Sequence, residues 1–499
     1  MRNKSRTRVA GRRPTSYGLF ISFCSNSAGQ GAEAATAIAR RLLNSSDEAR
    51  AVAMASIVII GAGLAGSLLA SRLASRHRVT LIEQSRRSVP LRVIDRGRPA
   101  ALDPHVAAGL GGTTAYWHNG LIELEASDYA AWPLPATELQ RFIPAAHDAL
   151  SGASITRVRD IAAELRTGLA AAGAPARLLG SPMFYPARRR NVWHAENVVA
   201  RGVATIVGRV DRLTIDDGGR VRGVVLHGGT EITGDIVILA AGGLGSPAIL
   251  QASGASAFNY AGRFYFDHPV GFVGEITVSA DLNRLWNRFD RELQGSVRLP
   301  FCVATPPLKF AFYLRPAGPT ALKAKSVLSD LRNRPLDPRL YAKLLLHTND
   351  IVEALSLRAG VNIPTRRFVL YMSAEQPVQD ERAIAGTPGA VTRDWRLDEN
   401  FFAAANQAIR HLLAELAPIV ARSTVFERWP DDLQTAAHHC GTCRMAATAE
   451  AGVADPDGRV FGTTNLYVCD GSAIPAAGYA NTGLTIGALA LRLAESIHG

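Results

Sequence analysis

Residues 56–66 read SIVIIGAGLAG, and this stretch decides the fold. Its first five residues form a short β-branched run, which is too brief for a helix and is typical of a buried parallel strand. Gly61, Gly63 and Gly66 follow at the spacing that serves a tight turn, a close backbone approach to a pyrophosphate, and close packing of a helix on a strand. The helical pattern SLLASRLASRH comes next, so phosphates would meet the positive end of a helix.

A second strand pattern, VTLIE, ends in Glu83. This acid lies 22 residues after Gly61, where a ribose-binding carboxylate belongs in a dinucleotide fold. Since the strand, the glycine turn, the helix, the second strand and the acid all agree, the sequence predicts a dinucleotide-binding unit. The unit does not by itself distinguish FAD from NAD.

Two further glycine-rich segments extend this interpretation. The buried strand pattern IVILAAGG ends at Gly243, and SPAILQASG then begins a helix with Pro247 near its first turn. Two separate strand-to-glycine turns fit one nucleotide held from both sides. Residues 109–120, GLGGTTAYWHNG, suit a backbone that lies against a polar planar ligand, although an ordinary surface loop is the alternative.

Composition excludes several classes of protein. A chain of 499 residues is too long for one ordinary core, so we expect two or three domains. The net charge is +12, but residues 1–53 hold nine Lys/Arg against three Asp/Glu, and the remaining excess forms no dense basic stripe that would favour nucleic acid. No apolar run reaches the roughly 18 residues of a membrane span. Five cysteines indicate a reducing compartment, so we expect a cytoplasmic protein, with an export signal in residues 1–53 as the open alternative.

The order of the patterns predicts an α/β fold with a discontinuous Rossmann-like domain. We expect residues 54–254 and 431–499 to build the nucleotide-binding domain, and residues 255–430 to form an inserted α+β substrate domain on an antiparallel sheet. Residues 1–53 are expected to be a basic, disordered extension. Within the first part, residues 136–151 have the spacing of one surface helix.

The C-terminal region carries the residues with catalytic chemistry. It contains AHHCGTCRMA, with His438 and His439, and then NLYVCDGSAIPAAGYANTGLTI, with Asn481 at an expected helix start. An alcohol gives up a hydride readily once its hydroxyl proton is removed, and histidine has a suitable pKa for that work. The alternative is that both histidines are structural. The CxxC of Cys440 and Cys443 is expected to be packing, because no second CxxC completes a zinc site, so no metal is expected.

Taken together, these motifs resemble the glucose–methanol–choline (GMC) oxidoreductase family of FAD enzymes. The resemblance covers roughly residues 54–499, and it rests on motifs that occur in the family's order: IVIIGAGLAG, GLGGTT, LAAGGLGSPAILQASG, GRFYFDHP, the EQP segment at 375–377, HHCGTCRM, GVADPDGRVFGTTNLYVCDGSAIP and ANTGLTIGALALRLAE. In detail the motifs are closest to the pyranose-oxidase-like and bacterial branch that acts on sugars and other secondary alcohols.

The resemblance assigns roles to individual residues. It implies that His438 is the catalytic base and Asn481 its partner. It also implies an FAD site made of Gly61, Gly63, Gly66, Glu83 and Val210 around the ADP half, Gly112, Thr113, Thr114, His118 and Asn119 near the flavin, and Asp470 and Gly471 at the ribityl–phosphate region. Tyr116 stands where some relatives carry a histidine bonded to FAD, so we expect non-covalent FAD. Thr482 replaces the usual proline, which leaves the helix start less rigid.

The function implied is oxidation of a CH–OH group on a small-molecule alcohol, such as a sugar, a glycoside or another secondary alcohol. The electron acceptor stays open among oxygen, a quinone and a cytochrome. Three alternatives differ in class. They are a lyase on the same fold, an NAD-dependent Rossmann enzyme, and an FAD-binding protein without catalysis.

Overall fold

A five-stranded parallel sheet organises the nucleotide-binding half of the protein. In this computed structural model its strand order is β23 (Leu466–Val468), β12 (Ile236–Leu239), β1 (Ser56–Ile60), β2 (Arg78–Glu83) and β8 (Ala204–Val207). All four pairings are parallel, so the carboxyl ends of the strands meet at one edge. The structure describes residues 54–97, 106–115, 117, 119–188, 190–279, 287–316, 336–345 and 366–498.

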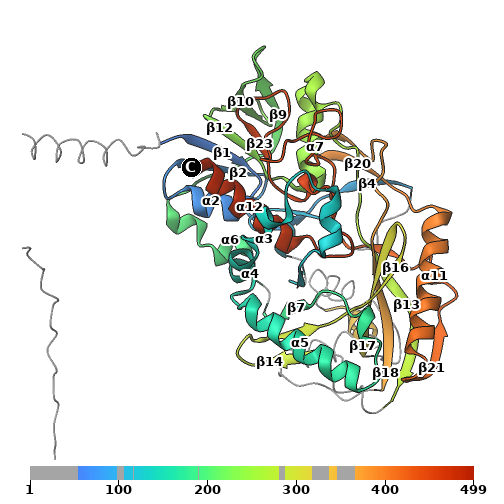
Figure 1. The fold of residues 1–499 in the computed structure, drawn as a ribbon. Helices are drawn as coiled ribbons and strands as arrows, with labels where there is room; N and C mark the ends of the chain where they lie inside the picture. Colours follow the sequence, from blue (N-terminus) through green and yellow to red (C-terminus); the bar gives the residue numbers. More distant parts are fainter. Residues whose placement is uncertain are drawn as a thin grey trace, which may run out of the picture. The chain divides into compact units, whose positions relative to one another are not determined.

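Helices from both ends of the chain cover this sheet. The helix α2 (Leu64–Leu73) follows β1 directly, and α12 (Gly483–His498) packs against both α2 and α4 (Ile143–Ser151). Figure 1 shows α2 in blue beside α12 in red, so segments more than four hundred residues apart share one layer. The helix α7 (Gly242–Ser253) contacts β9 of a small antiparallel sheet, β9 (Val210–Ile215), β10 (Val221–Leu226) and β11 (Glu231–Ile232).

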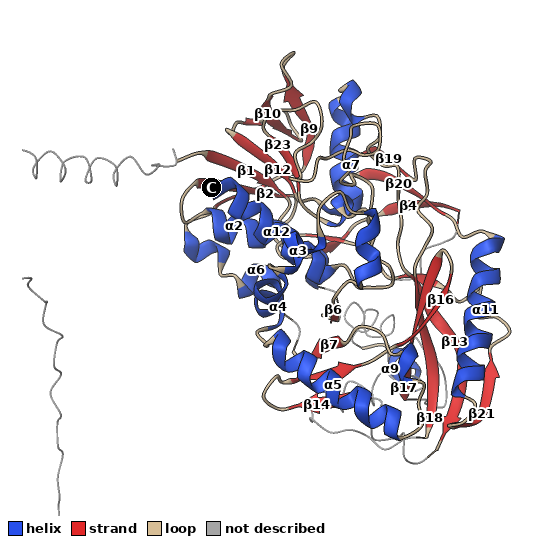
Figure 2. Ribbon diagram, in the orientation of Figure 1, coloured by secondary structure: helices blue, strands red, loops and turns tan. Residues whose placement is uncertain are grey.

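A second hydrophobic core packs against an antiparallel sheet. Its strands run in the order β16 (Phe301–Thr305), β17 (Leu308–Pro316), β18 (Arg367–Ala374), β13 (Pro269–Val278) and β21 (Val420–Val425), and β22 (Gln434–Thr435) pairs with the start of β13. Alternate residues of β17 and β18, such as Phe312 and Met372, are buried in this core with side chains of α11 (Glu399–Leu416) and α5 (Ile155–Ala171). Figure 2 shows α11 along one side of this sheet.

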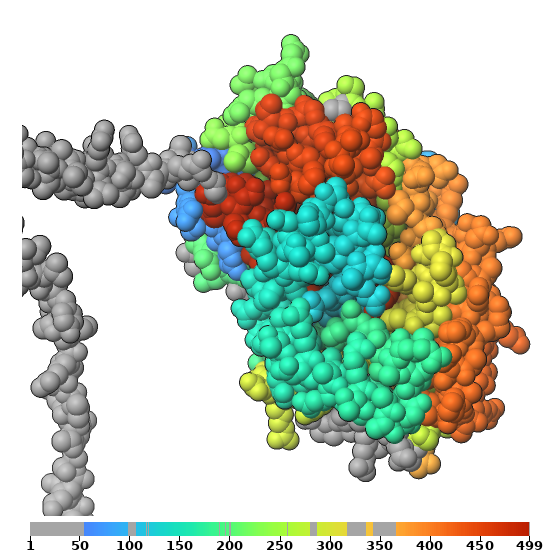
Figure 3. Space-filling model, in the orientation of Figure 1, coloured from blue at the N-terminus to red at the C-terminus, as the bar shows by residue number. Residues whose placement is uncertain are grey.

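The chain passes between the two cores more often than a linear division suggests. Residues of α5 belong to the second core although they precede residue 254. An antiparallel four-stranded sheet joins β14 (Asn287–Asp290) and β15 (Gly295–Arg298) to β7 (Met183–Pro186) and β6 (Leu121–Ile122). Figure 3 shows the cyan and green surface of this earlier part of the chain below the red C-terminal segment and to the left of the orange one. The domain limits given above therefore stay predictions.

Short elements complete the description. The strand β4 (Val93–Gly97) pairs with β20 (Ala390–Trp395), which pairs with β19 (Ile384–Thr387), and β3 (Val89–Pro90) pairs with β5 (Ala107–Ala108). Within the described ranges, the remaining helices are α3 (Ala136–Gln140), α6 (Val192–Ala195) and α9 (Pro338–Leu345), with 3-10 turns at Gly112–Ala115, Ala126–Ala131, Ala176–Leu178, Val198–Arg201, Ser256–Phe258 and Gly471–Ala473.

The predicted fold class is confirmed: a Rossmann-like α/β half with a parallel sheet is joined to an α+β half on an antiparallel sheet. The single helix predicted over 136–151 is wrong in detail, since the structure has α3 and α4 separated at Arg141–Phe142. Pro144 lies at the start of α4, where its missing N–H is tolerated and a new helix can begin. Among the described helices, none combines the length and apolar character that a membrane span requires.

Candidate active site

Four glycines, Gly61, Gly63, Gly66 and Gly242, lie in the turns at the carboxyl edge of the parallel sheet, and we call this group the glycine cradle. Gly61 has a φ of +105°, and a Cβ there would lie 2.4 Å from the carbonyl oxygen of Ala240. A Cβ on Gly66 would lie 1.9 Å from the oxygen of Gly61. A Cβ on Gly63 would instead have no atom within 4 Å in the part of the chain that the structure describes. Gly61 and Gly66 are therefore required by the protein's own packing, whereas Gly63 borders open space at the start of α2.

Glu83 joins three loops at the end of β2. Its buried carboxylate accepts hydrogen bonds from the backbone N–H groups of Ala62, Gln84 and Gly109, at 2.8, 2.8 and 2.9 Å. Burial raises the pKa of Glu83, and these N–H donors oppose the shift because they favour the charged form. Glu83 thus holds the glycine turn against the next loop. Its contact with a ribose stays a prediction.

The loop after Gly109 lies on the glycine turn. The Gly111 N–H donates to the Ala62 oxygen at 2.8 Å, and a Cβ on Gly112 would lie 2.9 Å from the Cα of Gly63. Asn119 is fully buried with a φ of 57°, and neither polar atom of its side chain finds a hydrogen-bond partner among the described residues. A buried amide of this kind requires a partner, and the polar edge of a cofactor ring would supply one.

Further residues that were predicted to bind the cofactor are Thr113, Thr114, Val210 and His118. Thr114 is buried and its hydroxyl donates to the Gly111 oxygen, while the Thr113 hydroxyl accepts from Ala107 at 3.5 Å. Val210 is buried at the start of β9. His118 and Tyr116 lie outside the described residues, so the predictions about them are not addressed.

Asp470 connects the second glycine turn to the C-terminal segment. Its carboxylate accepts from the Gly242 N–H at 2.8 Å, from the Ser246 hydroxyl at 2.6 Å, and from the N–H and hydroxyl of Ser472 at 2.8 and 2.6 Å. Burial raises the pKa of Asp470, and these bonds act against the shift. Because the carboxylate is already saturated by the protein, Asp470 organises the turn. Gly471 follows Asp470 in the chain, and a Cβ added to Gly471 would lie 3.0 Å from the carbonyl oxygen of His439.

The residues thus fit a dinucleotide cofactor at this edge. The open space at Gly63 leaves room for a pyrophosphate. Gly242, with a φ of +79°, likewise has no atom of the described ranges within 4 Å of the position that a Cβ would take. Both glycines stand at helix N-termini, where backbone N–H groups and the helix dipole favour anionic groups. Asn119 has a buried amide that could bond to the polar part of a ring system.

A bulge beside the second sheet explains the position of His438. Pro269 pairs with Thr435, and Phe266 pairs with Cys440. The three residue steps from Phe266 to Pro269 are therefore matched by five residue steps from Thr435 to Cys440. The two extra residues are accommodated through Ala437, which has a left-handed φ of 62°. The backbone N–H of His438 donates to the side-chain carboxylate of Asp267 at 3.0 Å. Bulges often re-aim a side chain next to a functional site, and this one brings the rings of His438 and His268 together.

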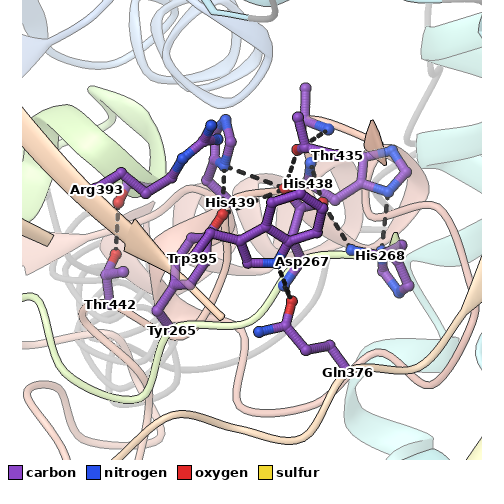
Figure 4. Close-up of polar contacts among 12 residues, drawn as sticks. Tyr265, Asp267, His268, Gln376, Arg393, Trp395, Thr435, His438, His439 and Thr442 are labelled. Carbon is purple, nitrogen blue, oxygen red and sulfur yellow. Dashed lines mark hydrogen bonds and ion pairs between the residues drawn. The ribbon is translucent and has the colours of Figure 1, made fainter. Parts of the chain in front are cut away.

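Asp267 is the buried anion at the centre of this group (Figure 4). It has 0% exposure, and it accepts from the backbone N–H groups of His268 and His438 and from the Thr435 hydroxyl. Burial opposes its charge, but hydrogen bonding and the fields of His439 and His438 outweigh that cost and hold the pKa of Asp267 well below its usual range. A fixed negative charge therefore lies beside His438.

The two adjacent histidines have different surroundings. His439 is buried, its Nδ1 lies 3.0 Å from the Tyr265 hydroxyl and 3.4 Å from Asp267, and burial lowers its pKa. His438 is half-buried and its Nδ1 lies 2.9 Å from the Nδ1 of His268. This geometry favours a structural role for His439 and leaves His438 as the candidate base.

Asn481 lies next to the loop that carries Asn119. Its side-chain Nδ2 donates to the Gly120 oxygen at 3.1 Å, and α12 begins two residues later at Gly483. The same C-terminal loop contacts His268, because the Gly478 oxygen lies 2.9 Å from His268 Nε2. Although Thr482 replaces a proline, α12 forms, and the Ile486 N–H donates to the Thr482 oxygen at 2.9 Å.

The CxxC cysteines are buried and unbridged. Cys440 and Cys443 are both free with 0% exposure, and burial raises their pKa values well above normal, so neither has the thiolate character that redox or metal chemistry requires. Ligand atoms of Asp267, His268 and His438 do lie within 4.8 Å of one another. Their contacts are, however, hydrogen bonds between protein groups.

Two residues of the motif GRFYFDHP, Asp267 and His268, had no role predicted from the sequence. The signal that could have found them is an Asp–His pair immediately before a strand, since polar residues at such a position need partners. Glu375 also had no predicted role, although it accepts from the Lys309 N–H at 3.1 Å. Burial, followed by the nearby charge of Asp128, raises the pKa of Glu375 to about 7.

Glu375 gives the protein a testable pH dependence. A carboxyl whose pKa is higher in the folded state than in the unfolded state costs stability once it ionises, so its contribution falls as pH rises from about 4.5 to about 7. We expect Glu375→Gln to match the wild type near pH 5 and to be more stable by on the order of 1–3 kcal/mol at pH 8. Thermal unfolding at both pH values measures this. A stability difference that does not vary with pH would contradict it.

Comparisons with known proteins concern the family and the fold of this chain. Residues 387–490 match a family model described as GMC oxidoreductase, and residues 59–89 match one described as an NAD(P)-binding Rossmann-like domain. A crystal structure of pyridoxine 4-oxidase from Mesorbium loti has a similar fold, with a TM-score of 0.58 at 18% identity over 89% of this chain and 99% of that one.

Two curated proteins share shorter segments. A long-chain-alcohol oxidase from Arabidopsis thaliana is 34% identical over 91 residues, which are 18% of this chain and 12% of that protein. A cholesterol oxidase from Acinetobacter baumannii is 50% identical over 56 residues, 11% of this chain and 10% of that protein. The matched segments thus span about a tenth of each relative's length.

Proposed function

Because the chain belongs to the glucose–methanol–choline (GMC) oxidoreductase family, whose members bind FAD, we propose that it oxidises the CH–OH group of a small-molecule alcohol with His438 as the general base. The observation that carries the proposal is the position of His438 in a bulge beside the buried charge of Asp267. That bulge lies in the same C-terminal segment as Asp470, whose carboxylate accepts from the Gly242 N–H of the glycine cradle, and a Cβ on Gly471 would lie 3.0 Å from the His439 oxygen.

His438 would take the hydroxyl proton of the alcohol at a ring nitrogen. Removing that proton raises the electron density on the substrate oxygen and makes the neighbouring C–H bond a better hydride donor. The negative charge of Asp267 stabilises the imidazolium that results, as the mutual field of the two groups already indicates. FAD, when bound at the glycine cradle, supplies the hydride acceptor.

Asn481 would orient the substrate oxygen. One N–H of its amide is used by Gly120, and the second can donate to the oxygen as it gains negative charge. The amide adds no charge that would compete with the base. The N-terminus of α12 lies close by in sequence and would favour negative charge on a neighbouring group.

Replacing Asn481 by alanine tests this role. We expect flavin reduction by the alcohol to slow by about 100-fold, the usual loss for one such donor, while FAD content stays at the wild-type level. Asn400→Ala, on the exposed side of α11, is the matched control and should leave the rate unchanged. A wild-type rate in Asn481→Ala would remove this residue from the mechanism.

The function itself is tested by anaerobic titration of the purified holoprotein with a panel of sugars, glycosides, sterols and aliphatic alcohols. We expect at least one to bleach the visible flavin spectrum, and mixing the reduced protein with oxygen, a quinone or cytochrome c then identifies the acceptor. A flavin that dithionite bleaches but no alcohol does would favour an FAD-binding protein without this activity.

A further inference from the structure

His268 lies between the candidate base and the C-terminal loop. Its Nε2 is 2.9 Å from the Gly478 oxygen, and its Nδ1 is 2.9 Å from the Nδ1 of His438 (Figure 4 shows the second contact). The two imidazole rings meet edge to face, at 5.0 Å between centroids and 78° between planes. Building on the proposed function, we propose that His268 is a positioning residue that fixes the tautomer of His438.

The carbonyl of Gly478 determines where the proton of His268 resides. A carbonyl oxygen only accepts, so the contact requires a proton on His268 Nε2. His268 has 0% exposure, and burial lowers its pKa, so the ring is neutral. A neutral imidazole carries one proton, and His268 Nδ1 is therefore an acceptor.

The same reasoning extends to His438. Since His268 Nδ1 accepts, the 2.9 Å contact requires that His438 Nδ1 donates. In neutral His438 the lone pair then resides on Nε2. The chain from Gly478 through His268 thus selects Nε2 of His438 as the nitrogen that takes the substrate proton. Ring orientation and tautomer are fixed together, as they are wherever a histidine's second nitrogen has a firm partner.

The surroundings keep His268 neutral during the reaction. The Asp267 carboxylate accepts from the backbone N–H of His268, not from its ring, and its other contacts are with the His438 N–H, the Thr435 and Tyr265 hydroxyls, and His439. The remaining nearby acid, Asp128, is bonded to Lys309, and lies behind Gly478, where a Cβ would meet its carboxylate at 2.5 Å. No acid of the described residues thus bonds to the His268 ring, so a proton taken by His438 stays there beside Asp267.

Three substitutions separate positioning from packing. His268→Asn puts an amide oxygen near the former Nδ1, where it can accept from His438, and His268→Phe keeps the volume but accepts nothing. We expect the Phe variant to slow flavin reduction by alcohol about 10- to 100-fold, and the Asn variant to recover most of that loss. His268→Gln extends the amide towards Gly478 and should resemble Phe. FAD content and thermal stability show that each variant is folded.

Nitrogen-15 spectra of the histidine-labelled holoprotein give a readout independent of turnover. The His438 signals are assigned by their loss in His438→Gln. We expect protonated Nδ1 and unprotonated Nε2 in the wild type and in His268→Asn, and loss of this preference in His268→Phe. A wild-type His438 protonated at Nε2, or a stoichiometric metal bound by Asp267, His268 and His438, would overturn the proposal. If no alcohol reduces the wild-type flavin, the proposed function fails, yet the tautomer result still decides this inference.

Discussion

Replacing His438 by alanine is expected to slow reduction of the bound flavin by an alcohol by about 10²- to 10⁴-fold, while FAD stays bound. The loss is large because the alcohol would have to give up its hydride with its hydroxyl proton still attached. Water can enter the vacated space, but it is a much weaker base than imidazole. FAD binding is spared because the glycine cradle is built from other residues, around Gly61 and Gly242.

Anaerobic rapid mixing of each variant with a reactive alcohol measures this effect. His411→Asn is the matched control, because His411 is exposed on α11 and its removal should change nothing. Dithionite should reduce wild type and variant alike, which shows that the flavin itself is intact. Since raising pH can supply hydroxide as a substitute base, the deficit of His438→Ala should shrink at alkaline pH. An unchanged rate at neutral pH would exclude His438 as the base.

The second large effect concerns the cofactor. We expect Gly63→Val to fold as an apoprotein but to lose FAD affinity by at least about 100-fold, or nearly 3 kcal/mol. A Cβ on Gly63 would have no atom of the described residues within 4 Å, and the φ of −72° at Gly63 is ordinary for any residue. The added side chain therefore fills space that only a bound pyrophosphate would need.

Gly66→Ala provides the contrast. A Cβ at Gly66 would lie 1.9 Å from the Gly61 oxygen, so this variant should lower apoprotein stability as well as FAD content. Thermal unfolding of both apoproteins, together with FAD titration by fluorescence, distinguishes the two outcomes. If Gly63→Val binds FAD as tightly as the wild type, the cofactor does not approach the chain at this turn.

The Rossmann-like half could be predicted from the sequence because its signals are local. SIVIIGAGLAG places the strand, the turn and the helix within eleven residues, and backbone atoms leave no room for a Cβ at Gly61 or Gly66. The same holds for the IVILAAGG turn, which the structure places at the neighbouring strand β12. Short-range geometry determines these elements, and tertiary contacts did not have to be known.

The surroundings of the base could not be predicted in the same way. Asp267 and His268 lie some 170 residues before His438, and only the bulge at Ala437 brings them to it. That bulge arises from two strand pairings whose registers differ, which no local pattern of a single strand reveals. The pKa of Glu375 likewise depends on Asp128 and Lys309, which reach it from other segments.

The proposed function depends on hydride transfer from an alcohol carbon to the bound flavin, and deuterium at that carbon reports on this step. The most reactive alcohol of the panel is prepared with deuterium on the carbinol carbon and mixed anaerobically with the holoprotein. We predict that the flavin bleaches completely with both substrates and several-fold more slowly with the deuterated one. Bleaching that no alcohol produces, or that proceeds without breaking the carbinol C–H bond, would contradict the account.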